Sequence, residues 1–399
     1  MGQSSPPPTA SPAEKAAWLA RNAVDCLPAS GLERKLASGR QLRVKLGIDP
    51  TAPDIHLGFT VVLGKLREFQ DLGHKVVLII GGFTARVGDP SGRSSTRPVL
   101  DPAQIDAHAA TFRDQALRVL NPDADLLEVR NNAEWLDMGM PELFSLLRTA
   151  TVGQMLERDD FAKRYAANQP ISVLELLYPL LQGYDSVAVR ADVELGATDQ
   201  KFNLLLGRDV QRAYHQPEQV IMTLPLLIGL DGERKMSKSF GNYIGVTDSP
   251  EEMYGRTLSI PDSLLENWYS LLLGRDPDPD LSARDAKRAL ARALVERFHG
   301  PEAPAAAEEH FDRVHVRHER PDDVDTVSWP ANGELVHMPA LLARAFGVST
   351  SEGRRSLAQG GVRLDGEPVA AGALDLPADQ VDGRVLQLGK RRFARIEIT

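Results

Sequence analysis

The sequence predicts an α/β protein whose largest part is a doubly wound parallel sheet, followed by an all-α segment and a small α+β unit. Leu42 to Asp49 (LRVKLGID) has the pattern of a strand, and the segment after it carries apolar residues at helical spacing up to Leu72. Lys75 to Thr84 (KVVLIIGGFT) is a continuous apolar run, which is typical of a strand buried in a parallel sheet. This order is a βαβ unit. Gln219 to Gly229 (QVIMTLPLLIG) has the composition of a late buried strand of the same sheet.

The remaining elements follow in chain order. Residues 1–12 are rich in Pro and Ser, which indicates a disordered lead-in before a first helix. Helical patterns over 101–120 and 135–156 predict that a long, mostly helical insertion interrupts the sheet. The pattern is helical again after Tyr243, and Glu319 to Glu334 is acidic, Pro-containing and aperiodic, as expected of a linker. The predicted units are a lead-in with an N-terminal helix at 1–34, a sheet unit with its insertion at 35–245, a helical unit at 246–330 and a terminal unit at 338–399.

Composition excludes several classes of protein. The single cysteine, Cys26, allows no intramolecular disulfide and no cysteine-based zinc site. The longest apolar run is too short to cross a bilayer and no apolar signal core follows the first methionine, so we expect a cytoplasmic protein without membrane contact. A net charge of −9 argues against nucleic-acid binding by the whole surface. From Met338 to Thr399, however, nine Lys or Arg accompany seven Asp or Glu, so the C-terminal end is where a polyanion is expected.

The loop after the first predicted strand gives the first functional hypothesis. His56 lies where this loop becomes a helix, and in an open parallel sheet ligands bind at that edge, where helix N-termini offer unpaired N–H groups to phosphate. Gly58 lets a nucleotide approach the backbone, because a Cβ there would fill the space. Considered alone, a histidine before a helix is more often an ordinary loop residue. The sequence has no P-loop and no G-x-G-x-x-G motif that would supply a competing phosphate site.

A basic loop follows the late strand. Gly229 to Asn242 (GLDGERKMSKSFGN) places Lys235 and Lys238 three residues apart in a Gly- and Ser-rich segment, which suits a mobile pair of point charges that bind a polyphosphate. On its own such a loop is more often a solvated basic turn. Taken together, a His-x-Gly element at the first strand–helix turn and Lys-Met-Ser-Lys-Ser after the last strand resemble the paired signature of class I aminoacyl-tRNA synthetases.

Longer segments resemble the bacterial tyrosyl-tRNA synthetase family, in order and spacing, from about residue 40 to the C-terminus. Besides the lysine loop they are LGIDPTAPDIHLG, GDPSGRSSTRP (Gly88 to Pro98) and LLYPLLQGYDSVAVRADVELGATDQKFN (Leu176 to Asn203). The resemblance implies a Rossmann-like catalytic domain, a helical anticodon-side domain and a homodimer with its interface in the inserted helices. It implies that ATP activates tyrosine as tyrosyl-adenylate, which then passes its acyl group to tRNA. Neither step needs a protein nucleophile, so catalysis depends on positioning and on stabilising charge on the phosphates.

The resemblance also assigns candidate residues to three parts of one site. The phosphates are expected beside Thr51, His56, Lys235, Lys238, Arg93 and Arg97. The ribose and adenine are expected beside Gly47, Asp49, Gly58, Asp199 and Gln200, with Lys238 also at the nucleotide. The amino acid is expected beside Tyr178, Gln182 and Asp89 at its ammonium group, with Thr84 nearby and Asp185 at the phenol. Mg²⁺ is expected to enter with the ATP, bound by phosphate oxygens and water, so no protein metal cage is predicted.

The terminal segment from Met338 to Val369 resembles an S4-type RNA-binding module. Ser351 to Leu357 has the pattern of a helix that presents Arg354 and Arg355, followed by a Gly360-Gly361 turn and a hairpin around Asp365-Gly366. Further basic residues that suit RNA phosphates are Lys390, Arg391 and Arg392. The alternative interpretation is a salt-bridged surface helix.

Four residues qualify the resemblance. Phe59 stands where the family normally has a polar residue that contacts the ribose, and Gly82 and Arg86, beside the expected tyrosine pocket, stand where relatives carry an acidic and a small or apolar residue. These differences leave open a divergent paralogue with altered amino-acid or acceptor specificity or inhibitor tolerance, and a non-catalytic RNA-binding protein. In one branch of the family, an aromatic residue at the position of Lys45 contacts the phenol of the substrate. Here Lys45 fits ordinary strand alternation, so the contact to the phenol is expected from another residue.

Overall fold

The computed structural model describes residues 6–50, 54–90, 101–316, 325–330, 335–389 and 392–399. Two compact units are present, Met1–Gly300 and Pro301–Thr399. The first unit contains, in chain order, α1 (Pro12–Ala20), β1 (Asp25–Leu27), α2 (Gly31–Leu36), β2 (Arg43–Ile48), α3 (Leu57–Asp71), β3 (Lys75–Ile80), α4 (Thr84–Val87), α5 (Pro102–Ala116), β4 (Leu127–Asn131), α6 (Ala133–Leu136), α7 (Met140–Leu147), α8 (Val152–Leu156), α9 (Asp159–Ala166), α10 (Val173–Ala188), β5 (Val193–Ala197), α11 (Lys201–Ala213), β6 (Val220–Leu224), α12 (Pro250–Leu258), α13 (Leu265–Trp268) and α14 (Ala283–His299). No helix among these described residues has the length and apolar character needed to cross a membrane.

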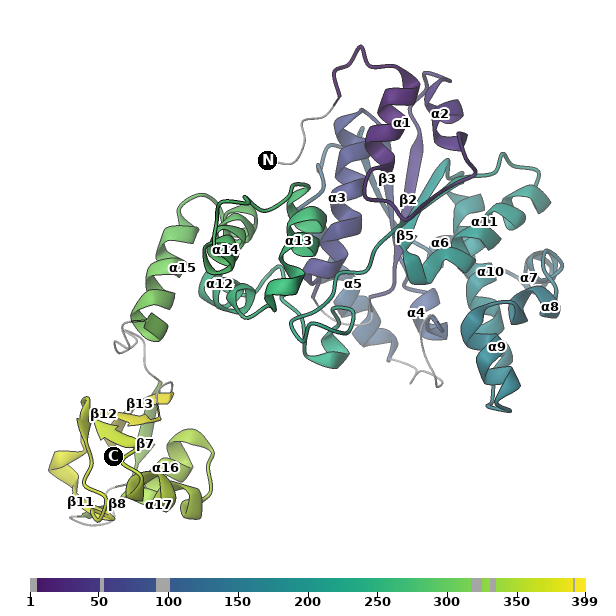
Figure 1. Cartoon of the computed structure of the whole chain (residues 1–399). Coiled ribbons are helices and arrows are strands. Elements are labelled where there is room, and N and C mark those ends of the chain that lie inside the picture. The colour runs from purple at the N-terminus through teal and green to yellow at the C-terminus, as the bar shows by residue number, and fades with distance from the viewer. Residues whose placement is uncertain (1–5, 51–53, 91–100, 317–324, 331–334, 390–391) are drawn as a thin grey trace. The chain divides into compact units, whose positions relative to one another are not determined.

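A six-stranded sheet with the order β1-β6-β5-β2-β3-β4 lies at the centre of the first unit (Figure 1). The five strands from β6 to β4 are parallel. The chain winds from β2 to β3 and β4 on one side and returns through β5 and β6 on the other, so its direction reverses between β2 and β5. The doubly wound fold predicted from the sequence is therefore confirmed, and the reversal marks where a ligand cleft is expected.

Two edge strands were not predicted. β1 pairs antiparallel with β6, although Asp25–Leu27 lies in the segment interpreted as a lead-in and first helix. β4 pairs with β3 and divides the predicted insertion. It was not predicted because every residue of Leu127–Asn131 is only partly buried and the polar composition of this segment gives no strand signal. The helical pattern predicted over 135–156 is likewise divided, into the end of α6 and the short helices α7 and α8.

β2 is more deeply buried than its sequence suggests. Val44, Lys45 and Leu46 are all buried, so the alternation that was interpreted as ordinary strand patterning does not place the side chain of Lys45 in water. The physical reason is that β2 is a central strand covered on both faces, where even a lysine must find buried acceptors.

Two helices position residues at the carboxyl end of the sheet. α3 begins at His56 as its N-cap, and buried residues such as Leu63, Leu66 and Phe69 anchor it. α10 begins with a capping box in which the Ser172 hydroxyl accepts from the helix and Glu175 accepts from the Ser172 backbone N–H. Figure 1 shows α7, α8 and α9 gathered beside α10.

The helices after the lysine loop pack as a continuation of the first unit. Tyr254, Trp268 and Tyr269 are fully buried there. The indole Nε1 of Trp268 donates to the carbonyl of Ile228 (3.0 Å), which attaches α13 to the segment that follows β6.

The second unit contains α15 (Ala303–Phe311), β7 (Thr326–Trp329), β8 (Leu335–His337), α16 (Met338–Phe346), α17 (Thr350–Ala358), β9 (Val362–Leu364), β10 (Glu367–Pro368), β11 (Asp375–Pro377), β12 (Val385–Leu388) and β13 (Arg392–Ile398). Its main sheet has the order β10-β9-β12-β13-β7. α17 and the β9–β10 hairpin lie where the sequence predicted them. β7 lies within the predicted linker and corrects it: a four-residue strand that pairs in parallel with β13, far along the chain, leaves little local signal.

Candidate active site

A cavity of about 560 Å³ lies at the carboxyl ends of β2 and β5, where the winding reverses. It brings together most residues that the sequence assigned to one site. The predicted residues that line it are Gly47, Asp49, His56, Gly58, Thr84, Asp89, Tyr178, Gln182, Asp185, Asp199, Gln200 and Lys235. Segments far apart in the chain therefore form one concave site with convergent polar groups.

Backbone pairing explains how the histidine segment and the lysine loop meet. The N–H of Leu57 donates to the carbonyl of Ile244 (2.9 Å), and the N–H of Val246 donates to the carbonyl of Ile55 (2.9 Å). The chain just after the lysine loop thus forms a short bridge with the first turn of α3. The loop itself is held by Asn242, whose side-chain oxygen accepts from the N–H of Ser237 (2.8 Å).

His56 is a neutral donor at the start of α3. Its Nδ1 accepts from the N–H of Gly58 (3.2 Å), so the neutral ring carries its proton on Nε2. Burial, together with the nearby charges of Lys238 and Lys235, lowers the pKa of His56 to about 4. The imidazole is therefore uncharged near neutral pH and can act as a hydrogen-bond donor to phosphate.

Both lysines of the basic loop pair with carboxylates. Lys235 Nζ lies 2.8 Å from Asp199 Oδ2, and Lys238 forms an ion pair with Asp54. Lys238 also lies over the ring of Tyr243 (5.5 Å to the centroid). The first pair places Lys235 beside the turn that follows β5, and the second places Lys238 just before the first turn of α3, although Lys238 does not itself line the cavity.

One end of the cavity is organised around Asp49. Its Oδ1 accepts from the Thr84 hydroxyl (2.7 Å) and its Oδ2 accepts from the Tyr178 hydroxyl (2.9 Å). Burial raises the pKa of Tyr178 well above its usual value, and the charge of Asp49 adds to this, so the phenol stays protonated as the donor. Asp49 thereby joins the end of β2 to α4 and α10.

Asp185 is a buried carboxylate held by two donors. Trp135 Nε1 donates to its Oδ1 (2.8 Å), and Asn132 Nδ2 lies 3.4 Å from its Oδ2. Burial raises the pKa of Asp185 to about 6, while the charge of Lys45 and these two donors act in the opposite direction. The carboxyl group is therefore largely ionised at neutral pH and oriented toward the cavity.

A chain of amides connects the other polar residues. Gln200 Nε2 donates to Asp89 Oδ2 (2.8 Å), and Asn203 Nδ2 donates to Gln182 Oε1 (2.9 Å) and to Gln200 Oε1 (3.2 Å). As a result, one wall of the cavity carries carboxylate and amide oxygens, and these are acceptors suited to an ammonium group.

Comparison with known proteins identifies the family. The model of class I tRNA synthetases (W and Y) matches residues 37–315. A tyrosine–tRNA ligase of Moorella thermoacetica is 49% identical over 396 residues, covering 95% of this chain and 94% of that protein. The enzyme of the same name from Coxiella burnetii is 47% identical over 392 residues, covering 95% and 97%.

The chain belongs to the tyrosine–tRNA ligase family of class I tRNA synthetases.

Solved structures of tyrosyl-tRNA synthetases share this fold. A C-terminally truncated mitochondrial enzyme of Aspergillus nidulans gives a TM-score of 0.63 at 22% identity, covering 76% of this chain and 94% of that one. The Aeropyrum pernix enzyme gives 0.60 at 22% identity, covering 75% and 97%. The predicted fold class of this tyrosine–tRNA ligase family member is thus confirmed by fold comparison as well as by its own sheet topology.

Several predicted residues cannot be placed in the site. Thr51, Arg93, Arg97, Lys390 and Arg391 lie outside the described residues. In the second unit Arg354, Arg355 and Arg392 are exposed, the first two on α17 and the third at the start of β13.

The departures from the family pattern have different structural settings. Phe59 lines the cavity and packs on the imidazole of His56, with 4.7 Å between ring centroids. A Cβ at Gly82 would lie 2.6 Å from Asn131 Oδ1, so this glycine allows close packing against the end of β4. Arg86 is exposed, and neither it nor Gly82 lines the cavity. This chain is 49% and 47% identical to two tyrosine–tRNA ligases over 95% of its length. Such identity does not favour the divergent paralogue or the non-catalytic RNA-binding protein.

Sequence reasoning missed Asn132 and Trp135, the partners of Asp185. Their only signal is a position just after a parallel strand, at the edge where ligands bind, and that strand was not predicted. It also missed the buried partners of Lys45, because Gln182 and Ser186 lie on α10 and Glu194 lies on β5, all distant from Lys45 in the sequence.

Proposed function

We propose that this protein activates tyrosine with ATP to give tyrosyl-adenylate and pyrophosphate and then transfers tyrosine to its tRNA. The observation that carries the proposal is one cavity lined both by Asp185 and the amide residues and by His56 and Lys235 of the lysine loop. Such a cavity can align a tyrosine carboxylate with the α-phosphate, which is the main requirement of a reaction without a protein nucleophile.

The proposed role of each residue follows from its charge. Neutral His56 and the cations Lys235 and Lys238 stabilise the negative charge that develops on the phosphates, because donors fixed before the reaction need no reorganisation during it. Asp199 accepts from a ribose hydroxyl after releasing Lys235 to the phosphates. Mg²⁺ enters with the ATP as part of the substrate; the described residues contain no cluster of three His, Cys, Asp or Glu able to hold a metal ion.

Asp185 sets the amino-acid specificity. A tyrosine phenol donates to this buried carboxylate, whereas phenylalanine would leave it without that donor. Tyrosyl-tRNA synthetases are themselves the standard example of such discrimination.

The proposal includes further partners. The second unit binds tRNA as an S4-like module through exposed arginines of α17 and β13. The protein is a homodimer whose interface lies in the inserted helices, which display exposed apolar side chains: Met140, Phe144, Val152, Tyr165, Val173 and Leu174. It works in the cytoplasm, where its substrates ATP and tRNA are found.

Amino-acid-dependent exchange of pyrophosphate into ATP tests the proposed reaction. Tyrosine should support exchange and phenylalanine should not. Lys238→Ala should lower the exchange rate by about a hundredfold, as expected when one charge-assisted hydrogen bond to the transition state is removed. Its control is Lys287→Ala, which removes a lysine paired with Asp262. Absence of tyrosine-dependent exchange, or equal rates in both variants, would contradict the proposal.

A further inference from the structure

A buried ion pair lies behind the wall of the amino-acid cavity. Lys45 Nζ and Glu194 Oε1 are 2.8 Å apart, and the side chains are 0% and 1% exposed. The two residues are register partners on β2 and β5, the strands between which the winding reverses. Neither residue lines the cavity.

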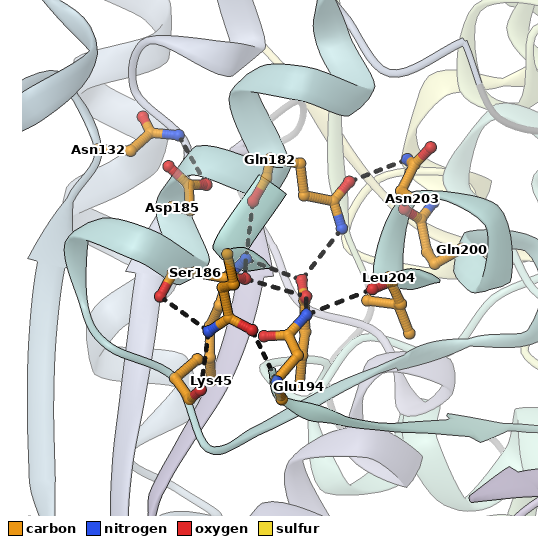
Figure 2. Close-up of polar contacts among 12 residues, drawn as sticks. Lys45, Asn132, Gln182, Asp185, Ser186, Glu194, Gln200, Asn203 and Leu204 are labelled. Carbon is orange, nitrogen blue, oxygen red and sulfur yellow. Dashed lines mark hydrogen bonds and ion pairs between the residues drawn. The ribbon is translucent and has the colours of Figure 1, made fainter. Parts of the chain in front are cut away.

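Lys45 joins the sheet to α10. Besides Glu194, its ammonium group donates to the Ser186 hydroxyl (2.9 Å) and to the main-chain carbonyl of Gln182 (2.9 Å), both on α10 (Figure 2). These contacts use all three N–H donors of the lysine. Lys45 therefore has no donor left for a substrate phenol.

The carboxylate of Glu194 fixes which way the Gln182 amide faces. Its Oε1 accepts from Gln182 Nε2 (3.3 Å), and its Oε2 accepts from Ser186 Oγ (3.2 Å) and from Gln219. An ionised carboxylate only accepts hydrogen bonds, so the nitrogen of the amide must face it. Figure 2 shows the Gln182 side chain between Glu194 and Asn203, with its oxygen on the Asn203 side.

The same helix carries the residues proposed to hold tyrosine. Tyr178, Gln182 and Asp185 occupy positions i, i+4 and i+7 of α10, which share one face of a helix. The contacts that fix the height and rotation of α10 above β2 and β5 therefore determine the positions of all three side chains together. A buried ion pair adds little net stability over a well-packed apolar pair, so its effect on geometry is the more informative one to test.

We propose that Lys45 and Glu194 are positioning residues of the amino-acid site: they hold α10 against the sheet and turn the Gln182 side-chain oxygen away from Glu194, so that Gln182, which lines the cavity, offers an acceptor to the substrate ammonium group. This inference rests on the proposed tyrosine activation. It assigns the pair a larger effect on tyrosine binding than on ATP binding.

The test replaces both charges at once with Lys45→Met/Glu194→Leu, because either single change leaves a buried charge unpaired. Gln219 keeps the carbonyl of Leu204 as an acceptor in this variant. The Michaelis constants for tyrosine and for ATP are measured by pyrophosphate exchange, and thermal unfolding is recorded alongside. We expect the tyrosine constant to rise about tenfold, as for the removal of a buried hydrogen bond, and the ATP constant to stay within about twofold.

Lys65→Met is the matched control. Lys65 is also a buried lysine paired with a glutamate, Glu68, but it lies further along α3 and does not line the cavity. This control should change thermal stability and neither Michaelis constant. A tyrosine constant within about twofold of wild type in the double variant, or an equal rise in both constants, would overturn the inference.

Ser186→Ala keeps the inference testable if the double variant does not fold. It retains both charges and removes the hydroxyl that links them to α10. We expect a rise of about threefold in the tyrosine constant alone; no rise, or an equal rise for ATP, refutes the inference. Wild-type protein without tyrosine-dependent exchange would refute the proposed function and this inference with it, whereas normal wild-type exchange with unaltered variants would refute only the inference.

Discussion

Gly58 has no Cβ, and this leaves room for the imidazole of His56. A Cβ at this position would lie 2.9 Å from Cε1 and Nδ1 of the ring, which is closer than such atoms approach. We predict that Gly58→Ala displaces the imidazole and lowers kcat/KM for ATP about tenfold, since one hydrogen bond to the phosphates can no longer form. The measurement is ATP-dependent pyrophosphate exchange at saturating tyrosine.

Gly64→Ala is a matched control for this prediction on the same helix. The nearest atom to its added Cβ would be Arg297 Nη2 at 3.8 Å, which is an ordinary contact, and alanine favours a helix interior. Unchanged kinetics in Gly58→Ala, or an equal loss in Gly64→Ala, would show that the first turn of α3 does not depend on this space.

Asp185 predicts a pH dependence for tyrosine use. Because the pKa of Asp185 is raised to about 6, the free protein takes up a proton as the pH falls through that value and loses the anionic acceptor for the phenol. We expect kcat/KM for tyrosine to fall below about pH 6, approaching tenfold per pH unit, while His56, with its pKa of about 4, stays neutral. An exchange-rate profile checks this, and Asp185→Asn should remove the inflection.

Protonation of Asp185 does not itself destabilise the fold. The raised pKa of Asp185 makes the folded protein bind more protons than the unfolded chain between about pH 4 and 6, so its contribution to stability grows as the pH falls. The lowered pKa of His56 has the opposite effect as the pH falls from about 6.5 to 4. Thermal unfolding is therefore recorded over the same pH range, and a loss of folded protein at the assay temperature in step with the rate would contradict the assignment to Asp185.

Individual residues differ in how well the sequence predicts them. His56, Gly58, Lys235 and Asp185 were predicted because they belong to long motifs with fixed spacing, and the structure gathers them around one cavity. Lys45 was misjudged, because strand alternation carries no information about a carboxylate on a neighbouring strand. Asn132 and Trp135 were missed for a similar reason: their role appears only when Asp185 lies beside them.

Among the elements, the inserted helices carry the next prediction. Phe144 on α7 is 50% exposed, although apolar side chains of this size are normally covered. If these helices form the proposed dimer interface, Phe144→Glu should convert dimers to monomers in sedimentation analysis, because it places a charge in the buried interface. Val24→Glu is the control, since Val24 is 58% exposed but lies outside the insertion. Dissociation by both variants, or by neither, would argue against this interface.

Burial explains only part of which strands were predicted. β3 and β6 are continuous apolar runs and β2 has a strand pattern, so all three were predicted, whereas β5 is central and buried but was not. The edge strands β1, β4 and β7 are short or only partly buried, and each exists because of pairing with a strand distant in sequence. Local patterns cannot contain that information.

At the scale of the whole molecule, the two units predict separable activities. Arg354 and Arg355 are exposed on α17 of the second unit, whereas the proposed activation site lies wholly within the first. Arg354→Ala/Arg355→Ala should weaken tRNA binding. In a plot of log affinity against log salt concentration, the magnitude of the slope should fall by about one for each RNA phosphate that an arginine no longer neutralises. Tyrosine-dependent pyrophosphate exchange should be unchanged. Loss of exchange, or a salt slope equal to that of wild type, would contradict this division of labour.

The backbone bridge between Ile55–Leu57 and Ile244–Val246 has a consequence for how the protein is made. Almost two hundred residues separate the two halves of this bridge, and the first turn of α3 obtains its partner only when the later half has been synthesised. A ribosome that is still translating the insertion therefore carries a nascent polypeptide whose histidine segment lacks this backbone partner. We expect the ability to consume ATP to begin late in synthesis, after the growing chain has passed Val246.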